Sequence, residues 1–153
     1  MGARRGKSKK RFDGSWHSLS QLSEFILYLD ENLCNTSAIL EVLANVGVRY
    51  ERHLHHFSRG ELDEIWLPVV GKNGWVLLTA DKRIRYNLLE KRALSQHSVR
   101  EFVFASGNLS GADMAAALEA ALPKMQKLLR TVRPPFVASI TRKGEVHLRW
   151  PKK

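Results

Sequence analysis

The chain has 153 residues, enough for one domain with a sizeable buried core, and its 44% hydrophobic and 26% charged residues are ordinary for a globular protein. Its single cysteine, Cys34, excludes a disulfide framework and a cysteine-based zinc site. No apolar run approaches the roughly 18 residues of a membrane span. The basic N-terminus lacks the apolar stretch of a signal peptide, so we expect a cytoplasmic protein without a membrane partner.

The positive charge is concentrated at one end of the chain. The formal net charge is +10, with a pI near 10.1. Six cations and no acid fall in residues 1–11; without them, the remaining 19 basic and 15 acidic residues leave +4. A basic arm on a mildly basic domain suits a polyanion such as RNA, although a disordered arm that only improves solubility has the same composition. We expect a disordered basic arm over residues 1–15 and a single domain over residues 16–153.

The first elements are predicted around a short apolar run. Residues 25–29 are mostly apolar and precede an acidic pair, as in a strand buried on both faces of a parallel sheet. Apolar residues at helical spacing predict a helix over residues 37–46, which Gly47 ends. The alternating residues 48–53 indicate a strand nearer the edge of the sheet.

The next helix carries a candidate acid. The three histidines of residues 53–56 have no acidic or cysteine partner nearby, and we expect them in a solvated loop. Ser58 followed by Glu61 is a capping-box pattern, which predicts that a helix starts there. On a helical wheel, Asp63 falls at the margin of the apolar face, whereas Glu64 points away from it. Asp63 is therefore the acid expected to face inward, near the positive end of the helix dipole.

The rest of the chain continues the alternation of strands and helices. We expect strands over residues 75–79 and 100–105, helices over 83–92 and 111–122 with a kink or restart at Pro123, and a closing hairpin of 136–141 and 145–150. This alternation predicts right-handed crossovers and an α/β fold with a mainly parallel sheet.

Three acids are expected at one edge of this sheet. Asp30 follows the first strand, Asp81 follows the third, and Asp63 opens the helix that leads into the third. Parallel strands bring their carboxyl ends to one edge, where open α/β folds bind their ligands. Carboxylate oxygens around an open position suit Mg²⁺ or Mn²⁺, which can activate water and stabilise charge on a phosphodiester.

Several segments, in this order, resemble the PIN-like domain family. They are residues 29–33 (LDENL), 60–65 (GELDEI) and 78–82 (LTADK), followed by 107–111 (GNLSG) and 134–136 (PPF). The resemblance covers about residues 25–150 and is closest to a subgroup related to VapC-type toxins. It implies a three-layer α/β/α PIN-like fold with a mainly parallel central sheet and a C-terminal hairpin.

The resemblance also implies a function. It implies a Mg²⁺- or Mn²⁺-dependent endoribonuclease, the toxin of a type II toxin–antitoxin pair. RNA, a cognate antitoxin protein and a second copy of the chain are the implied partners. Residue by residue, the family's catalytic acids and metal ligands fall on Asp30, Asp63 and Asp81, with Glu31 as a supporting metal ligand.

The sequence departs from the family directly after Asp81. PIN nucleases commonly carry a fourth acid there, whereas this chain has basic residues. The late acid Asp113 is explained by a capping box with Ser110. Cations at a helix start oppose its dipole, so we expect those after Asp81 to contact an RNA backbone. The predicted RNA-binding residues are Arg4, Arg5, Lys9, Lys10, Lys82, Arg83 and Arg85.

Two other functions fit parts of the sequence. A non-catalytic basic RNA-binding module would use its acids only to pair with Arg and Lys, and would retain RNA in a chelator, whereas a nuclease needs the metal for turnover. A phosphoaspartyl receiver-like switch leaves the basic arm and Asp63 without a role. The residues that such a switch would use are Asp30, Glu31, Asp81, Ser106 and Lys143.

Overall fold

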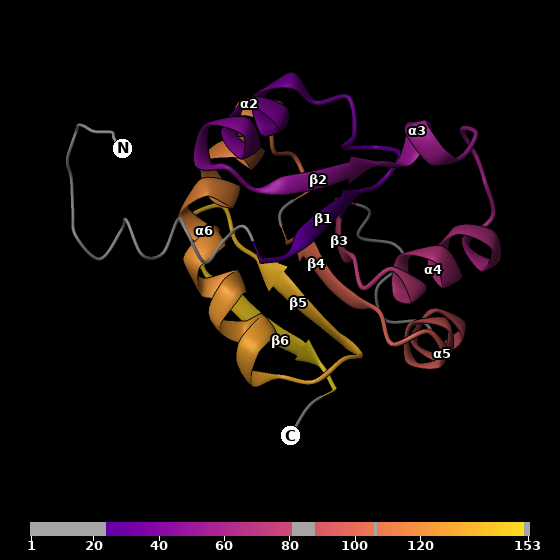
Figure 1. Cartoon of the computed structure of the whole chain (residues 1–153). Coiled ribbons are helices and arrows are strands. Elements are labelled where there is room, and N and C mark those ends of the chain that lie inside the picture. Colours follow the sequence, from indigo (N-terminus) through magenta and orange to yellow (C-terminus); the bar gives the residue numbers. More distant parts are fainter. Residues whose placement is uncertain (1–23, 81–87, 106, 152–153) are drawn as a thin grey trace, which may run out of the picture.

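One six-stranded sheet organises the chain. The computed structural model describes residues 24–80, 88–105 and 107–151. The strands are β1 (Ile26–Leu29), β2 (Arg49–Arg52), β3 (Val76–Thr79), β4 (Arg100–Phe104), β5 (Phe136–Ile140) and β6 (Val146–Trp150). The helices are α2 (Ser37–Val46), α3 (His53–His56), α4 (Asp63–Lys72), α5 (Leu88–Gln96) and α6 (Gly111–Thr131). The strands lie side by side in the order β2-β1-β3-β4-β5-β6 (Figure 1).

The strand order changes direction at β1, which is the topological switch point of the sheet. Strands β1 to β5 are parallel, and β6 returns antiparallel to β5 as the predicted hairpin. β2 lies on one side of β1 and β3 on the other, with Leu29 of β1 in register with Leu78 of β3. In open α/β sheets such a reversal leaves a crevice outside the carboxyl ends of the strands, and ligands bind there. The ends of β1 and β3 are therefore the natural place for a site.

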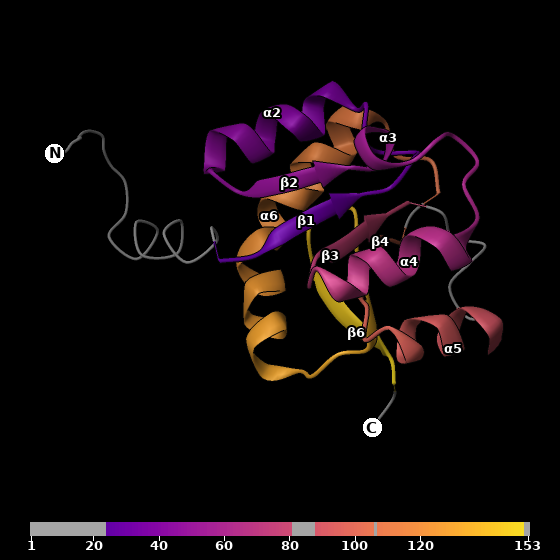
Figure 2. The same ribbon diagram turned by 45° about the vertical axis from the view of Figure 1, so that its right-hand side comes forward.

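Helices cover both faces of the sheet, which gives the molecule three layers. α2 and α6 pack on one face, whereas α4 and α5 lie on the other (Figure 2). Leu27 and Leu29 of β1 belong to the core under α2 and α6, and Tyr28 belongs to the core under α4 and α5. β1 is thus buried on both faces, as its apolar sequence predicts. The predicted α/β/α fold with a mainly parallel sheet and a C-terminal hairpin is confirmed.

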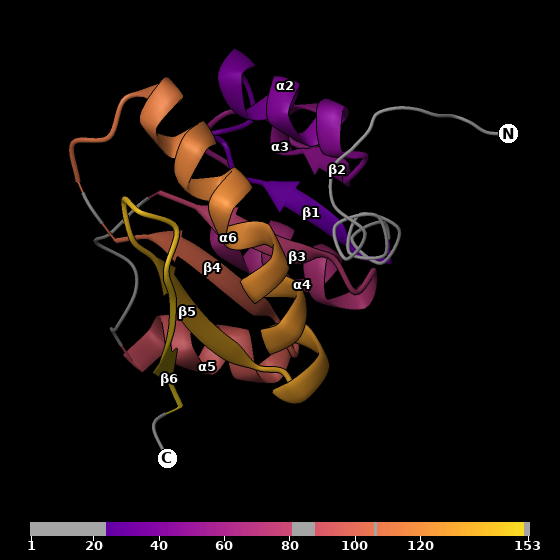
Figure 3. The ribbon, with the colours of Figure 1, turned by 90° about the vertical axis from the view of Figure 1, so that its left-hand side faces the viewer.

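Helix α6 does not restart at Pro123. It continues from Gly111 to Thr131, and Figure 3 shows it as one continuous ribbon across the sheet. Leu122 and Met125, on either side of the proline, are both buried. Tertiary packing therefore maintains the helix despite the hydrogen bond that proline removes.

The segment before α4 also differs from the expectation. α4 begins at Asp63, because the Ser58–Glu61 pattern forms a turn in which the N–H of Glu61 donates to the carbonyl of Ser58 at 3.2 Å. Gly60 has a φ of +82° within this turn, a left-handed conformation that cannot continue a right-handed helix. The predicted solvated loop at residues 53–56 is instead helix α3, and His53 is buried at 1% exposure.

The remaining expectations concern the ends of elements and the termini. α5 continues to Gln96 rather than ending near residue 92, because Leu94 packs into the core under α4 and α5. The predicted basic arm, residues 1–15, lies outside the described residues. Among the helices that the structure describes, none is long and apolar enough to cross a membrane.

Candidate functional site

Asp30, the first residue after β1, is held from several directions. Its Oδ1 accepts hydrogen bonds from the backbone N–H groups of Asn32 and Leu33, each at 3.0 Å. Its Oδ2 accepts a hydrogen bond from the hydroxyl of Thr79. The residue is only 7% exposed. These three hydrogen bonds fix the orientation of the Asp30 carboxyl group at the carboxyl end of β1.

Thr79 is a site residue that the sequence analysis missed. It is the last residue of β3 and is buried. Because β1 and β3 are adjacent and in register, the Thr79 hydroxyl reaches Asp30 across a separation of 49 residues in the chain. The available signal was a polar residue at the end of an apolar run, just before Asp81. That signal becomes specific only once β3 is known to lie next to β1.

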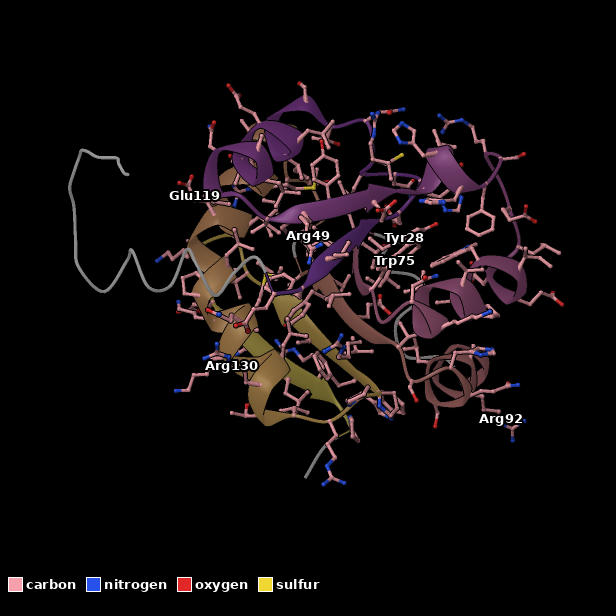
Figure 4. All side chains as sticks on the ribbon, in the orientation of Figure 1. Tyr28, Arg49, Trp75, Arg92, Glu119 and Arg130 are labelled. Carbon is pink, nitrogen blue, oxygen red and sulfur yellow. The ribbon has the colours of Figure 1, made fainter. Side chains whose placement is uncertain are left out.

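An aromatic cluster lies on the α4 side of β1. The buried Tyr28 ring is stacked with both Trp66 and Trp75, with centroid separations of 5.7 and 5.6 Å and interplanar angles of 17° and 9°. Figure 4 shows Tyr28 and Trp75 side by side. The Tyr28 hydroxyl lies 2.6 Å from Nδ1 of His53. Burial, and then the negative charge of Asp30, raise the pKa of Tyr28 well above its ordinary value, so the phenol keeps its proton.

Glu31 turns toward the connection between α3 and α4. Its Oε1 accepts a hydrogen bond from the backbone N–H of Gly60 at 2.7 Å, and its Oε2 lies 3.6 Å from a guanidinium nitrogen of Arg59. Nε2 of His53 lies 3.9 Å from Oε1 of Glu31. The two adjacent acids after β1 therefore make different contacts. Asp30 is hydrogen-bonded to Thr79 of β3, whereas Glu31 is hydrogen-bonded to Gly60 in the turn before α4.

The loop after β1 is also fixed from β2. The side chain of Arg52 donates from Nε to the carbonyl of Cys34 at 2.8 Å and from its terminal nitrogen to Oδ1 of Asn35. The Sγ of Cys34 is buried and donates to the carbonyl of Glu31 at 3.7 Å. These contacts hold the backbone that carries Asp30 and Glu31, and they leave the thiol in a structural role.

The other predicted site residues fall into two groups. Asp63 is the first residue of α4. Asp63 was expected to face inward and Glu64 outward, but both residues are exposed. Asp113 forms the predicted capping box with Ser110. The predicted residues that lie outside the described ranges are Arg4, Arg5, Lys9, Lys10, Asp81, Lys82, Arg83 and Arg85.

The chemistry of the predicted ligands fits a hard cation. Asp30, Glu31, Asp63 and Asp81 present only carboxylate oxygens, the donors that Mg²⁺ and Mn²⁺ prefer. Among the side chains that the structure describes, no group of three or more His, Cys, Asp or Glu is placed to hold a metal ion. Asp81, the acid predicted to complete such a set, lies outside the described residues.

Comparison with models of protein families identifies the class of domain to which most of the sheet is similar. A family model described as a PIN-like domain matches residues 26–106, which is more than half of the chain. The matched segment starts with β1 and ends just after β4, so it includes Asp30, Asp63 and Asp81. Searches among curated proteins and among solved structures found no match.

Proposed function

The chain belongs to the PIN-like domain family, whose members are typically nucleases, and on that premise we propose that it is a Mg²⁺- or Mn²⁺-dependent endoribonuclease. The observation that carries the proposal is the oriented, nearly buried carboxylate of Asp30 beside the end of β3. The resemblance to VapC-type toxins extends the proposal: the nuclease is the toxin of a type II toxin–antitoxin pair. Its partners are then RNA, an antitoxin protein and a second copy of the chain.

Each acid has a role in this proposal. Asp30, Asp63 and Asp81 hold the ion, and Glu31 supports them. When bound, the ion lowers the pKa of a water molecule and neutralises charge on the phosphodiester. Asp30 is oriented in advance by Thr79 and by backbone N–H groups of its own loop, so it needs little rearrangement to act as a ligand.

The test of the proposed function is metal-dependent cleavage. The full chain, incubated with a mixed RNA, should cleave it in Mg²⁺ or Mn²⁺ and should stop when a chelator is added, because the carboxylates alone cannot supply the charge stabilisation. Products are resolved on a denaturing gel. Equal cleavage in metal and in chelator would contradict the proposal.

A second candidate function is a non-catalytic RNA-binding module. The net charge of +10 favours it, because neutralisation of phosphates accounts for most nonspecific affinity. The same assay separates the two functions, since a binding module retains intact RNA in metal and in chelator alike.

The strand order β2-β1-β3-β4-β5 also occurs in receiver-like folds. Family membership, rather than strand order, therefore argues against the phosphoaspartyl switch.

Removal of the basic arm should weaken RNA binding and should also make that binding less dependent on the salt concentration. Residues 1–11 contain six cations and no acid. If each contacts a phosphate, their deletion should flatten the slope of log K against log salt by about 0.7 per contact with single-stranded RNA. Binding is measured by fluorescence anisotropy at several salt concentrations in the presence of chelator. A variant with the six cations replaced by Gln keeps the length of the arm and should reproduce the deletion; an unchanged slope in both would leave the arm without RNA contacts.

A further inference from the structure

His53 packs like an apolar ring but carries a buried polar atom. Tyr28 and Trp66 meet it edge-on, at centroid separations of 5.9 and 5.7 Å, and Phe57 meets it at 5.5 Å. Its Nε2 is buried and makes no hydrogen bond within the part of the chain that the structure describes. That atom faces Oε1 of Glu31 at 3.9 Å. A ring held this tightly by its neighbours directs Nε2 toward one carboxylate.

The imidazole of His53 has two polar neighbours, the Tyr28 hydroxyl at Nδ1 and the Glu31 carboxylate near Nε2. A carboxylate opposite Nε2 favours the tautomer with its proton on Nε2. Nδ1 is then an acceptor, and the Tyr28 hydroxyl donates to it across 2.6 Å. The order of contacts is therefore Tyr28 to His53 to Glu31, and it runs from the core under α4 to the loop after β1.

Glu31, which lies near His53, also contacts the turn at residues 58–61. The N–H of Gly60 donates to Oε1 of Glu31 at 2.7 Å, and Arg59 lies 3.6 Å from Oε2. Gly60 is the left-handed residue of this turn, and the turn is followed by Leu62 and by Asp63, the first residue of α4. The side chain of Glu31 thus joins the loop that contains Asp30 to the turn that leads into Asp63.

We infer that His53 and Glu31 are positioning residues that together hold the 58–61 turn against the end of β1, and so set the position of Asp63 relative to Asp30. Glu31 then acts through its contact with Gly60 rather than as a direct metal ligand. The effect on cleavage rests on the proposed nuclease function, whereas the contact with the turn does not.

The primary test measures opening of the turn without RNA or metal. Two readouts report it in the full chain: hydrogen exchange of the Gly60 amide, and trypsin cleavage after Arg59, whose side chain is 66% exposed. Loss of the hydrogen bond from the Gly60 N–H to the Glu31 carboxylate should accelerate both by about tenfold or more. Circular dichroism checks that each variant is folded.

Four variants separate positioning from packing. His53→Phe keeps the ring but loses Nε2, and Glu31→Ala removes the acceptor of the Gly60 N–H; both should open the turn. His53→Gln keeps a donor near the Nε2 position, and Glu31→Gln keeps an acceptor for Gly60, so both should stay within about threefold of the parent. The control is Glu51→Gln, which removes an exposed pair with His56 at 2.7 Å and should not affect the turn.

The outcomes are distinct. Faster Gly60 exchange in His53→Phe, restored by His53→Gln, supports the inference; parent-like exchange in folded His53→Phe would assign His53 to packing alone and overturn it. Mg²⁺ titration then tests the role of Glu31. A loss of Mg²⁺ affinity in Glu31→Gln as large as that in Glu31→Ala, with Gly60 still protected, would make Glu31 a ligand and also overturn the inference. A parent that never cleaves RNA would defeat the proposed function, but the exchange result would still stand.

Discussion

Replacement of Asp30 by Asn should lower the rate of metal-dependent RNA cleavage by about 100-fold to 1,000-fold, because a bound ion contributes several kcal/mol of transition-state stabilisation and each 1.36 kcal/mol is tenfold in rate. Asn keeps an oxygen that can accept from the N–H groups of Asn32 and Leu33, so the fold should be retained. What changes is the negative charge that holds a hard cation. Initial rates of RNA cleavage in Mg²⁺ and Mn²⁺ measure the loss.

RNA binding should respond in the opposite direction. In chelator, Asp30→Asn should bind RNA as well as the parent or more tightly, because repulsion between the carboxylate and the phosphates falls. Asp63→Asn and Asp81→Asn should lose cleavage in the same way. The controls are Glu64→Gln, an exposed acid, and Asp113→Asn, whose carboxylate accepts from the N–H of Ser110 and lies 3.4 Å from Arg142. A folded Asp30→Asn protein that cleaves at the parental rate would refute the assignment of the site.

Replacement of Tyr28 by Ala should lower the free energy of unfolding by about 3–5 kcal/mol, the range for large aromatic residues in a core. Tyr28 is fully buried, and its ring is stacked with both Trp66 and Trp75, so the substitution leaves a cavity beside two aromatic rings. A small domain has only about 5–15 kcal/mol in total, and the variant should be close to unfolding. Urea denaturation, followed by tryptophan fluorescence, measures the change.

Tyr28→Phe is the matched control for this experiment. It keeps the stacked ring and removes only the hydroxyl that lies 2.6 Å from Nδ1 of His53. The expected loss is about 1 kcal/mol, the net value of a typical hydrogen bond. If the Ala and Phe variants were equally stable, the stacked ring would not contribute as described.

Local sequence signals predicted most of the fold. The apolar run at residues 25–29 became β1, which is buried on both faces between β2 and β3, and Gly47 ends α2 with a φ of +79°. The Ser110 and Asp113 capping box occurs at the N-terminus of α6. Each of these features depends on residues that are close together in the sequence, which is why the sequence alone was enough to predict them.

The errors came where two local signals competed or where packing decided. Ser58 and Glu61 have the spacing of a capping box, but the left-handed Gly60 between them makes a turn instead. Pro123 should interrupt a helix, yet the buried residues on either side of it keep α6 continuous. His53 was expected in solvent because its partners, Tyr28 and Trp66, are distant in sequence.

The candidate site was predicted in part for the same reason. Asp30 could be placed because it directly follows a recognisable strand, and parallel strands bring their carboxyl ends together. The residues that orient it could not all be found, since the hydroxyl of Thr79 comes from a strand that is adjacent only in space. The contact of Glu31 with Gly60 likewise depends on a turn that was predicted as helix.

The bond between Asp30 and Thr79 has a consequence for the order in which the protein can be made. The two residues are 49 positions apart, and the ribosome delivers β1 well before β3. Parallel pairing across such a separation forms slowly, because the loop must close before its contacts form. Until Thr79 has emerged and β3 has joined β1, the carboxylate of Asp30 has only the N–H groups of its own loop to orient it. Under the proposed ribonuclease function, the candidate site is therefore incomplete during the part of translation that precedes the pairing of β3 with β1.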